Sequence, residues 1–231
     1  MISQLSILDI GKGLHVRRIE YQEAIPFLLE IHYARRIPSI TDAFGLFREN
    51  QIIGVVTYGV PASPSLCFGI AGKENARHVK ELNRLVIRPE FNKRERERER
   101  ENFASYLVSH SLRMLDPGTY VVSYADWGGW HHVGYVYQAT NFLYTGMTKE
   151  RTDIFSESGH SRHYDKSEIR RQIRTAKYRY VYLVGTKRDK ARMMKDLNYA
   201  IIHEYPKGVS ERYDTDNPVA IYDRAEEKTH D

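Results

Sequence analysis

The sequence predicts an α/β fold built around a mixed central sheet. Short runs with alternating apolar residues, typical of strands, are separated by longer runs whose apolar residues recur at helical spacing. The chain begins strand, helix, strand, strand, and later strands and helices continue to interleave. Elements in this order pack as helices on a sheet that contains both parallel and antiparallel strands.

The N-terminal part predicts a β-α-β-β unit. Its expected elements are a strand at 14–19, a helix at 23–36, and strands at 43–50 and 51–60. Pro26 fits this helix only in its first turn, because proline lacks the amide hydrogen that a helix interior needs. Helical spacing brings His32 and Tyr33 close to the helix end. A polar turn at Asn50 joins the last two strands.

The remaining elements are predicted from the same two patterns, which are alternation for strands and helical spacing for helices. We expect strands at 79–89, 120–126 and 178–185, and helices at 102–115, 134–141, 166–176 and 189–200. In the strand at 79–89, alternation places Leu85 and Ile87 on one face and Leu82, Arg84 and Val86 on the other. These elements predict one principal domain at 1–185, with a helical extension and acidic tail at 186–231 packed on it.

Composition limits the classes of function. The 35 basic residues exceed the 30 acidic ones by 5, and the basic residues concentrate between 162 and 195, which favours a polyanionic partner. Cys67 is the single cysteine, so neither a disulfide framework nor a cysteine zinc site is expected. The sequence shows neither a membrane-spanning run nor a secretory signal, which predicts a cytoplasmic protein.

One segment, "KRERERERE" at 93–101, has low complexity. It has no apolar face in either helical or extended form, which is typical of a solvated loop. Because it leads into the start of a helix, its arginines could instead meet an anion there. Asn102 or Ser105 is expected to cap that helix.

A resemblance to a known family emerges from the order of the motifs. The element order followed by "GYVYQATNFLYTG" resembles the GNAT acetyltransferases, with Val136–Tyr137 in place of a leucine–tyrosine pair and Asn141–Phe142 in place of Gly-Phe. More closely, "HYARR", "TYGVPAS", "ELNRLVI", "SYAD", "HVGYVYQATNFLYTG" and "KYRYVY" resemble the Mom family of phage DNA-modification proteins. The resemblance implies a GNAT-like fold, use of acetyl-CoA, and conversion of adenine N6 in double-stranded DNA to a carbamoylmethyl derivative. In a host bacterium, that product shields phage DNA from restriction.

The resemblance also implies roles for particular residues. Tyr137 matches the tyrosine that protonates the departing CoA thiolate. The implied catalytic residues are Asp126, Tyr137, Arg84 and Ser123. The implied acetyl-CoA contacts are Val86, Ile87, Arg88, Asn102, Ser105 and Asn141.

Recognition of DNA requires stacking and phosphate-binding groups. A base removed from the duplex is read by stacking and by hydrogen bonds at its edge. The expected stacking residues are Tyr124, Trp127 and Trp130, with His32 and Tyr33 on the opposite wall. Arg170, Arg171 and Arg174 on the helix predicted at 166–176 would contact phosphates.

Each of these residues also has a structural interpretation. Asp126 could form an Asx turn or a helix cap, Tyr137 could be a half-buried helix tyrosine, and Arg84 could pair with Glu81. The basic helix could be solvated. The adjacent histidines His131 and His132 point apart, so a structural zinc is not predicted.

The product itself sets a chemical requirement. Acetyl transfer leaves a carbonyl on N6, whereas a carbamoylmethyl group has a methylene there and an amide at its end. A nitrogen-supplying or redox step is therefore needed, and a labile metal at Asp126 and one histidine stays open. Two rival functions are an ordinary N-acetyltransferase acting on a small amine or a protein, and a non-enzymatic DNA-binding protein.

Overall fold

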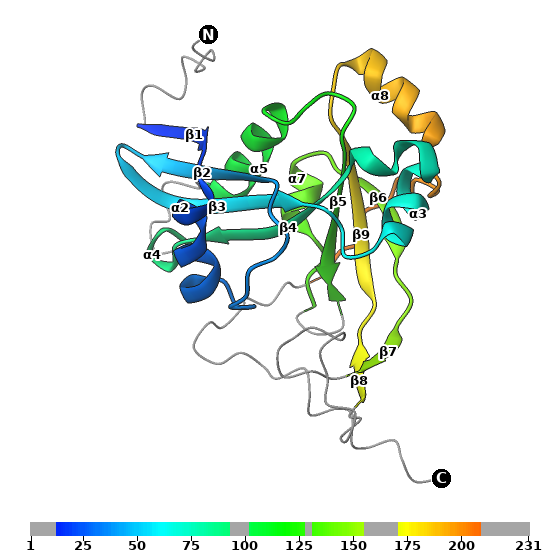
Figure 1. Cartoon of the computed structure of the whole chain (residues 1–231), viewed down its shortest axis with the longest axis horizontal. Coiled ribbons are helices and arrows are strands. Elements are labelled where there is room, and N and C mark those ends of the chain that lie inside the picture. Colours follow the sequence, from blue (N-terminus) through cyan, green and yellow to red (C-terminus); the bar gives the residue numbers. More distant parts are fainter. Residues whose placement is uncertain (1–12, 93–101, 128–130, 155–170, 209–231) are drawn as a thin grey trace.

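A computed structural model describes residues 13–92, 102–127, 131–154 and 171–208. It confirms the α/β prediction with a seven-stranded sheet in the order β1-β2-β3-β4-β5-β9-β6 (Figure 1). The strands are β1 (Leu14–Arg18), β2 (Asp42–Arg48), β3 (Gln51–Gly59), β4 (Val79–Ile87), β5 (Tyr120–Asp126), β6 (Leu143–Met147) and β9 (Lys177–Leu183). Within this sheet β4 and β5 run parallel, and the other neighbours run antiparallel.

Helices cover both faces of the sheet. They are α2 (Tyr21–Pro26), η1 (Phe27–Ile31), α3 (Pro64–Asn75), η2 (Ala76–His78), α4 (Pro89–Asn92), α5 (Phe103–Arg113), α7 (Tyr135–Ala139), α8 (Lys187–Met193) and η3 (Met194–Asp196). We call the face under α5 and α7 the α5 face, and the face under α2, η1 and α3 the α3 face. Alternation along β2 shows this division, because Phe44 packs in the core of the α5 face and Phe47 packs beneath α2 in the core of the α3 face.

The main core lies on the α5 face. Leu107, Val108 and Leu112 of α5 are buried against β1 to β4, and burial of each such side chain contributes roughly 1.5–3 kcal/mol. Helix α5 begins at Phe103 and is capped by Asn102, one of the two predicted caps, whose side chain accepts a hydrogen bond from the Ser105 amide at 3.3 Å. Tyr178, Tyr180 and Tyr182 of β9 also pack here, with Tyr180 fully buried.

The helix expected at 23–36 differs in its bounds and geometry. It begins earlier, at Tyr21, so Pro26 is the last residue of α2 and not part of its first turn. The chain then continues as a π-helix to Ile31. Proline cannot donate the interior helical hydrogen bond, which explains why the α-helical pattern ends at this position. His32 follows in extended conformation as the C-cap.

Two further helix predictions need correction. The helix expected at 166–176 is wrong where the chain is described, because β8 (Arg171–Arg174) pairs antiparallel with β7 (Arg151–Ile154) in a second sheet. The helix expected at 189–200 begins at Lys187 and ends with η3 at Asp196. The low-complexity run at 93–101 and residues 166–170 lie outside the described residues. In the described part of the chain, none of the helices is long and apolar enough to cross a membrane.

Candidate active site

The two parallel strands of the sheet separate to form a fork. β4 pairs with β5 only from Val79 to Glu81, opposite Tyr120 to Val122. Beyond this point β4 continues to Ile87 while pairing with β3, and β5 continues to Asp126 while pairing with β9. Figure 1 shows the two strands leaving their shared end in different directions. We call this point of divergence, just beyond the Glu81–Val122 pair, the fork.

A β-bulge at Asn83 accompanies the fork. Thr57 lies opposite Arg84 and Tyr58 opposite Leu82, so Asn83 is the extra residue of β4. Its side chain is held on both sides, accepting from the Thr57 hydroxyl at 2.6 Å and donating to the Ser39 carbonyl at 2.7 Å. A bulge bends its strand and increases the local twist.

The bulge also corrects the predicted faces of β4. Strict alternation places Leu82 on the same face as Arg84 and Val86. Because Asn83 is an extra residue, Leu82 and the residues after the bulge no longer follow this alternation. Leu82 instead shares the core of the α5 face with Ile87. Arg84 keeps the predicted face with Val86, because both follow the bulge.

Ser123 and Tyr137 meet at the tip of the fork. The buried Ser123 hydroxyl donates to the Leu82 carbonyl at 3.0 Å, where regular pairing of β4 with β5 has ended. Burial raises the pKa of Tyr137 to about 12, against a smaller lowering by a side-chain hydrogen bond with Ser123. Tyr137 therefore keeps its proton at neutral pH and is able to donate it.

The helix that carries Tyr137 is fixed by its N-cap. Gly134 has a φ of 80°, and an added Cβ would lie 2.6 Å from Cε2 of Tyr180 and 3.0 Å from Cδ2 of Tyr137. The Gln138 side chain donates to the Val133 carbonyl at 2.9 Å and to the Pro206 carbonyl at 3.0 Å. Glycine is thus required here both for its backbone conformation and for the close approach of the two rings.

Arg84 and His32 occupy the α3 face beside the fork. His32 is 7% exposed, its Nδ1 accepts from the Ala34 amide at 3.0 Å, and its ring stacks on Tyr33 at 4.4 Å. Burial lowers the pKa of His32 to about 3, with further lowering by the charges of Arg84 and Arg36. His32 is therefore neutral at neutral pH, with its ring proton on Nε2.

The guanidinium of Arg84 is only partly satisfied. One terminal nitrogen donates to the Asn83 carbonyl at 2.6 Å, whereas Nε is buried and has no hydrogen-bond partner among the described residues. Burial lowers the pKa of Arg84, and the nearby Glu81 carboxylate opposes this. The sequence suggested an ion pair between Arg84 and Glu81. In the described part of the chain their charges interact, but the Arg84 nitrogens and Glu81 oxygens do not form an ion pair within 4.0 Å.

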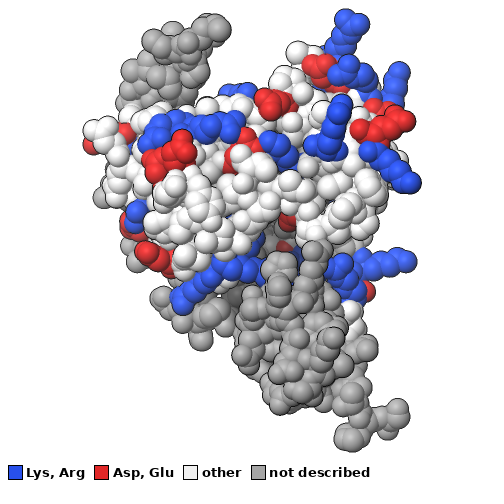
Figure 2. Space-filling view, in the orientation of Figure 1, with Lys and Arg blue, Asp and Glu red and all other residues white. Residues whose placement is uncertain are grey.

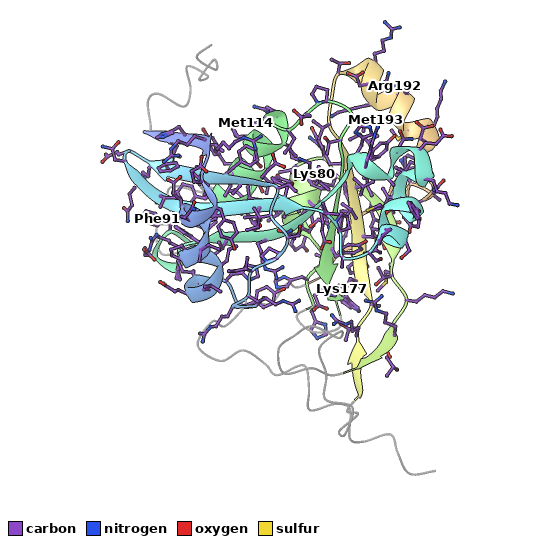
Figure 3. The ribbon with its side chains drawn as sticks, in the orientation of Figure 1. Lys80, Phe91, Met114, Lys177, Arg192 and Met193 are labelled. Carbon is purple, nitrogen blue, oxygen red and sulfur yellow. The ribbon has the colours of Figure 1, made fainter. Side chains whose placement is uncertain are left out.

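Asp126 lies at the end of β5, as predicted, and its carboxylate is engaged. It is 7% exposed and accepts from the Thr175 hydroxyl at 2.9 Å. Nζ of Lys177 lies 3.7 Å from its other oxygen. Figure 3 shows Lys177 at the lower end of β9, where β5 also ends. The Asp126 carbonyl also accepts from the His132 amide at 3.0 Å.

The aromatic residues predicted to stack are partly brought together. Trp127 makes edge contacts with His131 at 5.2 Å and with Tyr178 at 5.6 Å. Tyr124 lies on the α3 face, where burial raises its pKa and the Glu81 carboxylate raises it further. Trp130 lies outside the described residues.

The residues predicted to bind acetyl-CoA fall into two groups. Asn102 and Ser105 form the first turn of α5, and the buried Ser105 hydroxyl has no hydrogen-bond partner among the described residues. Val86 and Ile87 are buried in β4, so only their backbone is available to a ligand.

Arg88 and Asn141 are engaged elsewhere. Arg88 donates from Nε to the Ile52 carbonyl at 3.0 Å, and its guanidinium lies 4.7 Å from the Phe27 ring centre. Asn141 is an exposed residue with a φ of 61°, in the turn between α7 and β6. The acetyl-CoA contacts of Arg88 and Asn141 stay predictions, and the observed structure gives each residue a structural role as well.

Basic side chains border the α3 face. Figure 2 shows a row of them along the lower edge of the described surface. Arg35 and Arg36 are exposed in the segment after η1, and Arg174 lies at the end of β8. The side chain of Arg171 and all of Arg170 lie outside what the structure describes.

Three residues of the site were missed by the sequence analysis. Glu81 was considered only as a partner of Arg84, and Lys177 and Thr175 were not assigned to the site. Thr175 and Lys177 were undetectable because their approach to Asp126 depends on the pairing of β9 with β5. Glu81 had one local signal, because it is the single acidic residue of β4.

Metal ligands do not converge in the described part of the chain. No group of three or more His, Cys, Asp or Glu side chains among these residues is arranged to hold a metal ion. The histidines at 160 and 163 lie outside the described residues.

The fold and site define an α/β protein with a forked mixed sheet and an ionisable cluster at the fork. Solved structures with the same general arrangement are GNAT proteins. A GNAT-family acetyltransferase from Bacillus cereus is 13% identical, with 75% of this chain and 99% of that chain covered and a TM-score of 0.42. The GphF GNAT-like decarboxylase in complex with isobutyryl-CoA is 14% identical, with 74% and 100% covered and a TM-score of 0.43. Salmonella typhimurium yncA with its cofactor acetyl-CoA is 8% identical, with 75% and 95% covered and a TM-score of 0.42.

The family follows from the sequence match. The model of the Mom protein family matches residues 13–207, and the chain belongs to this family. This confirms the resemblance that the motifs indicated. Among curated proteins, none matches the chain.

Proposed function

We propose that the protein is an acetyl-CoA-dependent enzyme that modifies adenine N6 in double-stranded DNA. The observation that carries the proposal is the fork, where the Ser123 hydroxyl bonds the Leu82 carbonyl and interacts with the Tyr137 hydroxyl, while Arg84 and Glu81 lie on the neighbouring part of β4. Membership of the Mom family supports DNA as the substrate. The GNAT likeness named above concerns the fold.

The fork and the start of α5 suit an acyl-CoA. The first turn of a helix presents free amide groups to a phosphate, and α5 follows β4 and the short helix α4 in sequence order. The unpartnered Ser105 hydroxyl adds a donor at that turn. We propose that the CoA phosphates lie at α5 and that its thioester reaches the fork, with Tyr137 positioned to protonate the departing sulfur.

The α3 face suits a flipped adenine. Tyr33 and Tyr124 provide flat surfaces there, and the neutral His32 is able to donate a hydrogen bond without carrying charge. The basic residues along its border would hold the phosphates and carry no sequence information. Extraction of a base by stacking and edge hydrogen bonds is the general solution for enzymes that modify bases.

The predicted product is a carbamoylmethyl-type derivative that protects DNA from restriction. Its methylene and terminal amide require a nitrogen donor beyond acetyl-CoA. The mass of the modified nucleoside therefore distinguishes this product from a simple N6-acetyl group.

The test is to express the protein in bacteria and analyse the nucleosides of their DNA by mass spectrometry. We expect a fraction of deoxyadenosine to become heavier and the DNA to resist some restriction enzymes. Soluble, folded protein with unmodified DNA would contradict the proposal. Acetylation of free amines without DNA would favour an ordinary N-acetyltransferase, and absence of a thermal shift with acetyl-CoA would favour a DNA-binding protein without enzymatic activity.

A further inference from the structure

The side chain of Arg84 has hydrogen-bond donors that the described protein does not use. Nη1 donates to the Asn83 carbonyl at 2.6 Å, and this is the only hydrogen bond that the Arg84 side chain makes to a described residue. Nε is buried and has no partner among the described residues. On a guanidinium, Nε and Nη2 point in the same direction, so together they bind a carboxylate through parallel hydrogen bonds. The bond to Asn83 leaves this donor pair unused.

Positive charge is concentrated around the donor pair. The charges of Arg84 and Arg36 both act on His32, and the charge of Arg36 also acts on Arg84. Burial lowers the pKa of Arg84, and Arg36 lowers it further. These surroundings disfavour the charge of Arg84, and a bound anion would favour it. Ionisable groups in such surroundings are typical of functional sites.

The bulge of β4 brings a carboxylate to the same face. Residues three apart on a regular strand point to opposite faces, but Asn83 is an extra residue, so Glu81 and Arg84 both lie on the α3 face. The Glu81 side chain makes no hydrogen bond and no ion pair within 4.0 Å with a residue that the structure describes. Burial raises the pKa of Glu81, and the charges of Arg84 and Lys177 oppose the rise. Glu81 therefore also lacks a contacting partner for its charge among the described residues.

A ligand that carries both charges suits this arrangement. A carboxylate would bind Nε and Nη2 of Arg84, and an ammonium group would neutralise Glu81. A carboxylate and an ammonium group on one carbon atom are the common part of the α-amino acids. A DNA phosphate would bind the same arginine, but the nearby Glu81 carboxylate would repel it. The pair of opposite charges therefore favours an amino acid.

We propose that Arg84 and Glu81 bind an α-amino acid, with its carboxylate on Arg84 and its ammonium group on Glu81. The inference rests on the proposed function and deepens it, because an amino acid carries nitrogen, which the carbamoylmethyl product needs beyond acetyl-CoA. The charge of Glu81 acts on the hydroxyl of Tyr124, one of the surfaces proposed for the adenine. The amino acid and the adenine would thus be held side by side on the α3 face.

The experiment measures the thermal shift of the purified protein, without DNA, with each of the common amino acids in turn. We expect at least one amino acid to raise the Tm. Its amide, which lacks the carboxylate, and its N-acetyl form, which lacks the ammonium group, should not raise it. Absence of a shift with every amino acid would overturn the proposal. A shift with deoxyadenosine 5′-monophosphate alone, lost in Arg84→Gln, would overturn it as well, because Arg84 would then bind a DNA phosphate.

Matched variants locate the binding site. We expect Arg84→Gln and Glu81→Gln each to weaken binding of that amino acid by roughly 10–100-fold, as for hydrogen bonds to charged groups. Arg77→Gln makes the same substitution at an exposed arginine of η2 and should bind the amino acid as wild type does. Acetyl-CoA affinity, which should not change, shows that each variant is folded. Wild-type affinity for the amino acid in folded Arg84→Gln or Glu81→Gln would overturn the proposal.

Arg84→Lys keeps the test decisive if Arg84→Gln folds poorly. Lysine retains the positive charge but lacks the planar donor pair, so amino acid binding should still weaken. Wild-type affinity in this variant would contradict the assignment of the carboxylate to Nε and Nη2. Failure of the proposed function looks different, because wild-type protein would then bind the amino acid and leave DNA unmodified.

Discussion

The buried histidine beside the fork predicts a pH-dependent loss of stability. Burial, with the charges of Arg84 and Arg36, lowers the pKa of His32 from 6.5 to about 3 in the folded protein. An unfolded chain returns this histidine to its ordinary pKa. Between these two values the unfolded state binds a proton that the folded state rejects, so stability is complete above about pH 6.5 and is lost as the pH falls.

The magnitude follows from the two pKa values. Each unit between the pH and the unfolded pKa is worth about 1.4 kcal/mol while the folded form stays neutral. At pH 5, about 1.5 units below 6.5, the contribution of His32 should have fallen by about 2 kcal/mol relative to pH 8. A change of this size is a large share of the stability of an ordinary domain.

The assay is urea unfolding of wild type and His32→Asn at pH 8, 6 and 5. Asparagine retains an acceptor for the Ala34 amide but does not titrate, so its stability should fall less steeply with acid. The exposed His203, changed to asparagine, serves as the matched control and should leave the wild-type slope unchanged. Parallel stability curves for wild type and His32→Asn would refute the reasoning.

Two further predictions concern activity and DNA binding. Tyr137→Phe removes one hydroxyl and little packing, so the variant should melt near wild type and bind acetyl-CoA. Nucleoside analysis should show DNA modification reduced by roughly 10²–10⁴-fold. A fully active variant would show that Tyr137 is not a catalytic residue. Replacement of Arg170, Arg171 and Arg174 by alanine should weaken binding to all DNA sequences and flatten its salt dependence, because fewer counterions are released. Alanine at the exposed Lys187, Arg188 and Arg192 removes equal charge from α8, which Figure 3 shows at the opposite end of the molecule from Lys177, and should leave the slope unchanged. If the salt dependence of DNA binding is unchanged in the variant at 170, 171 and 174, the DNA-binding surface would instead be assigned to Arg35 and Arg36.

Much of the fold could be predicted because the pattern of each strand is local. Alternation of apolar residues depends on nearest neighbours in the chain, and it located the strand ending at Asp126 and the strand containing Tyr180. The cap at Asn102 is equally local, since it involves an amide only three residues away. The family motifs are short contiguous segments in a fixed order, so the sequence was sufficient to identify the family.

The tertiary structure decided what depends on partners that are distant in the chain. The segment at 171–174 has a helical pattern, but pairing with β7 makes it a strand, because backbone hydrogen bonds to a neighbour outweigh a weak local preference. The bulge at Asn83 exists because Thr57 and Ser39 hold its side chain, and it moves Leu82 to the other face. The engagement of Asp126 by Lys177 likewise arises from strand pairing, because β9 lies beside β5 with these two residues opposite each other.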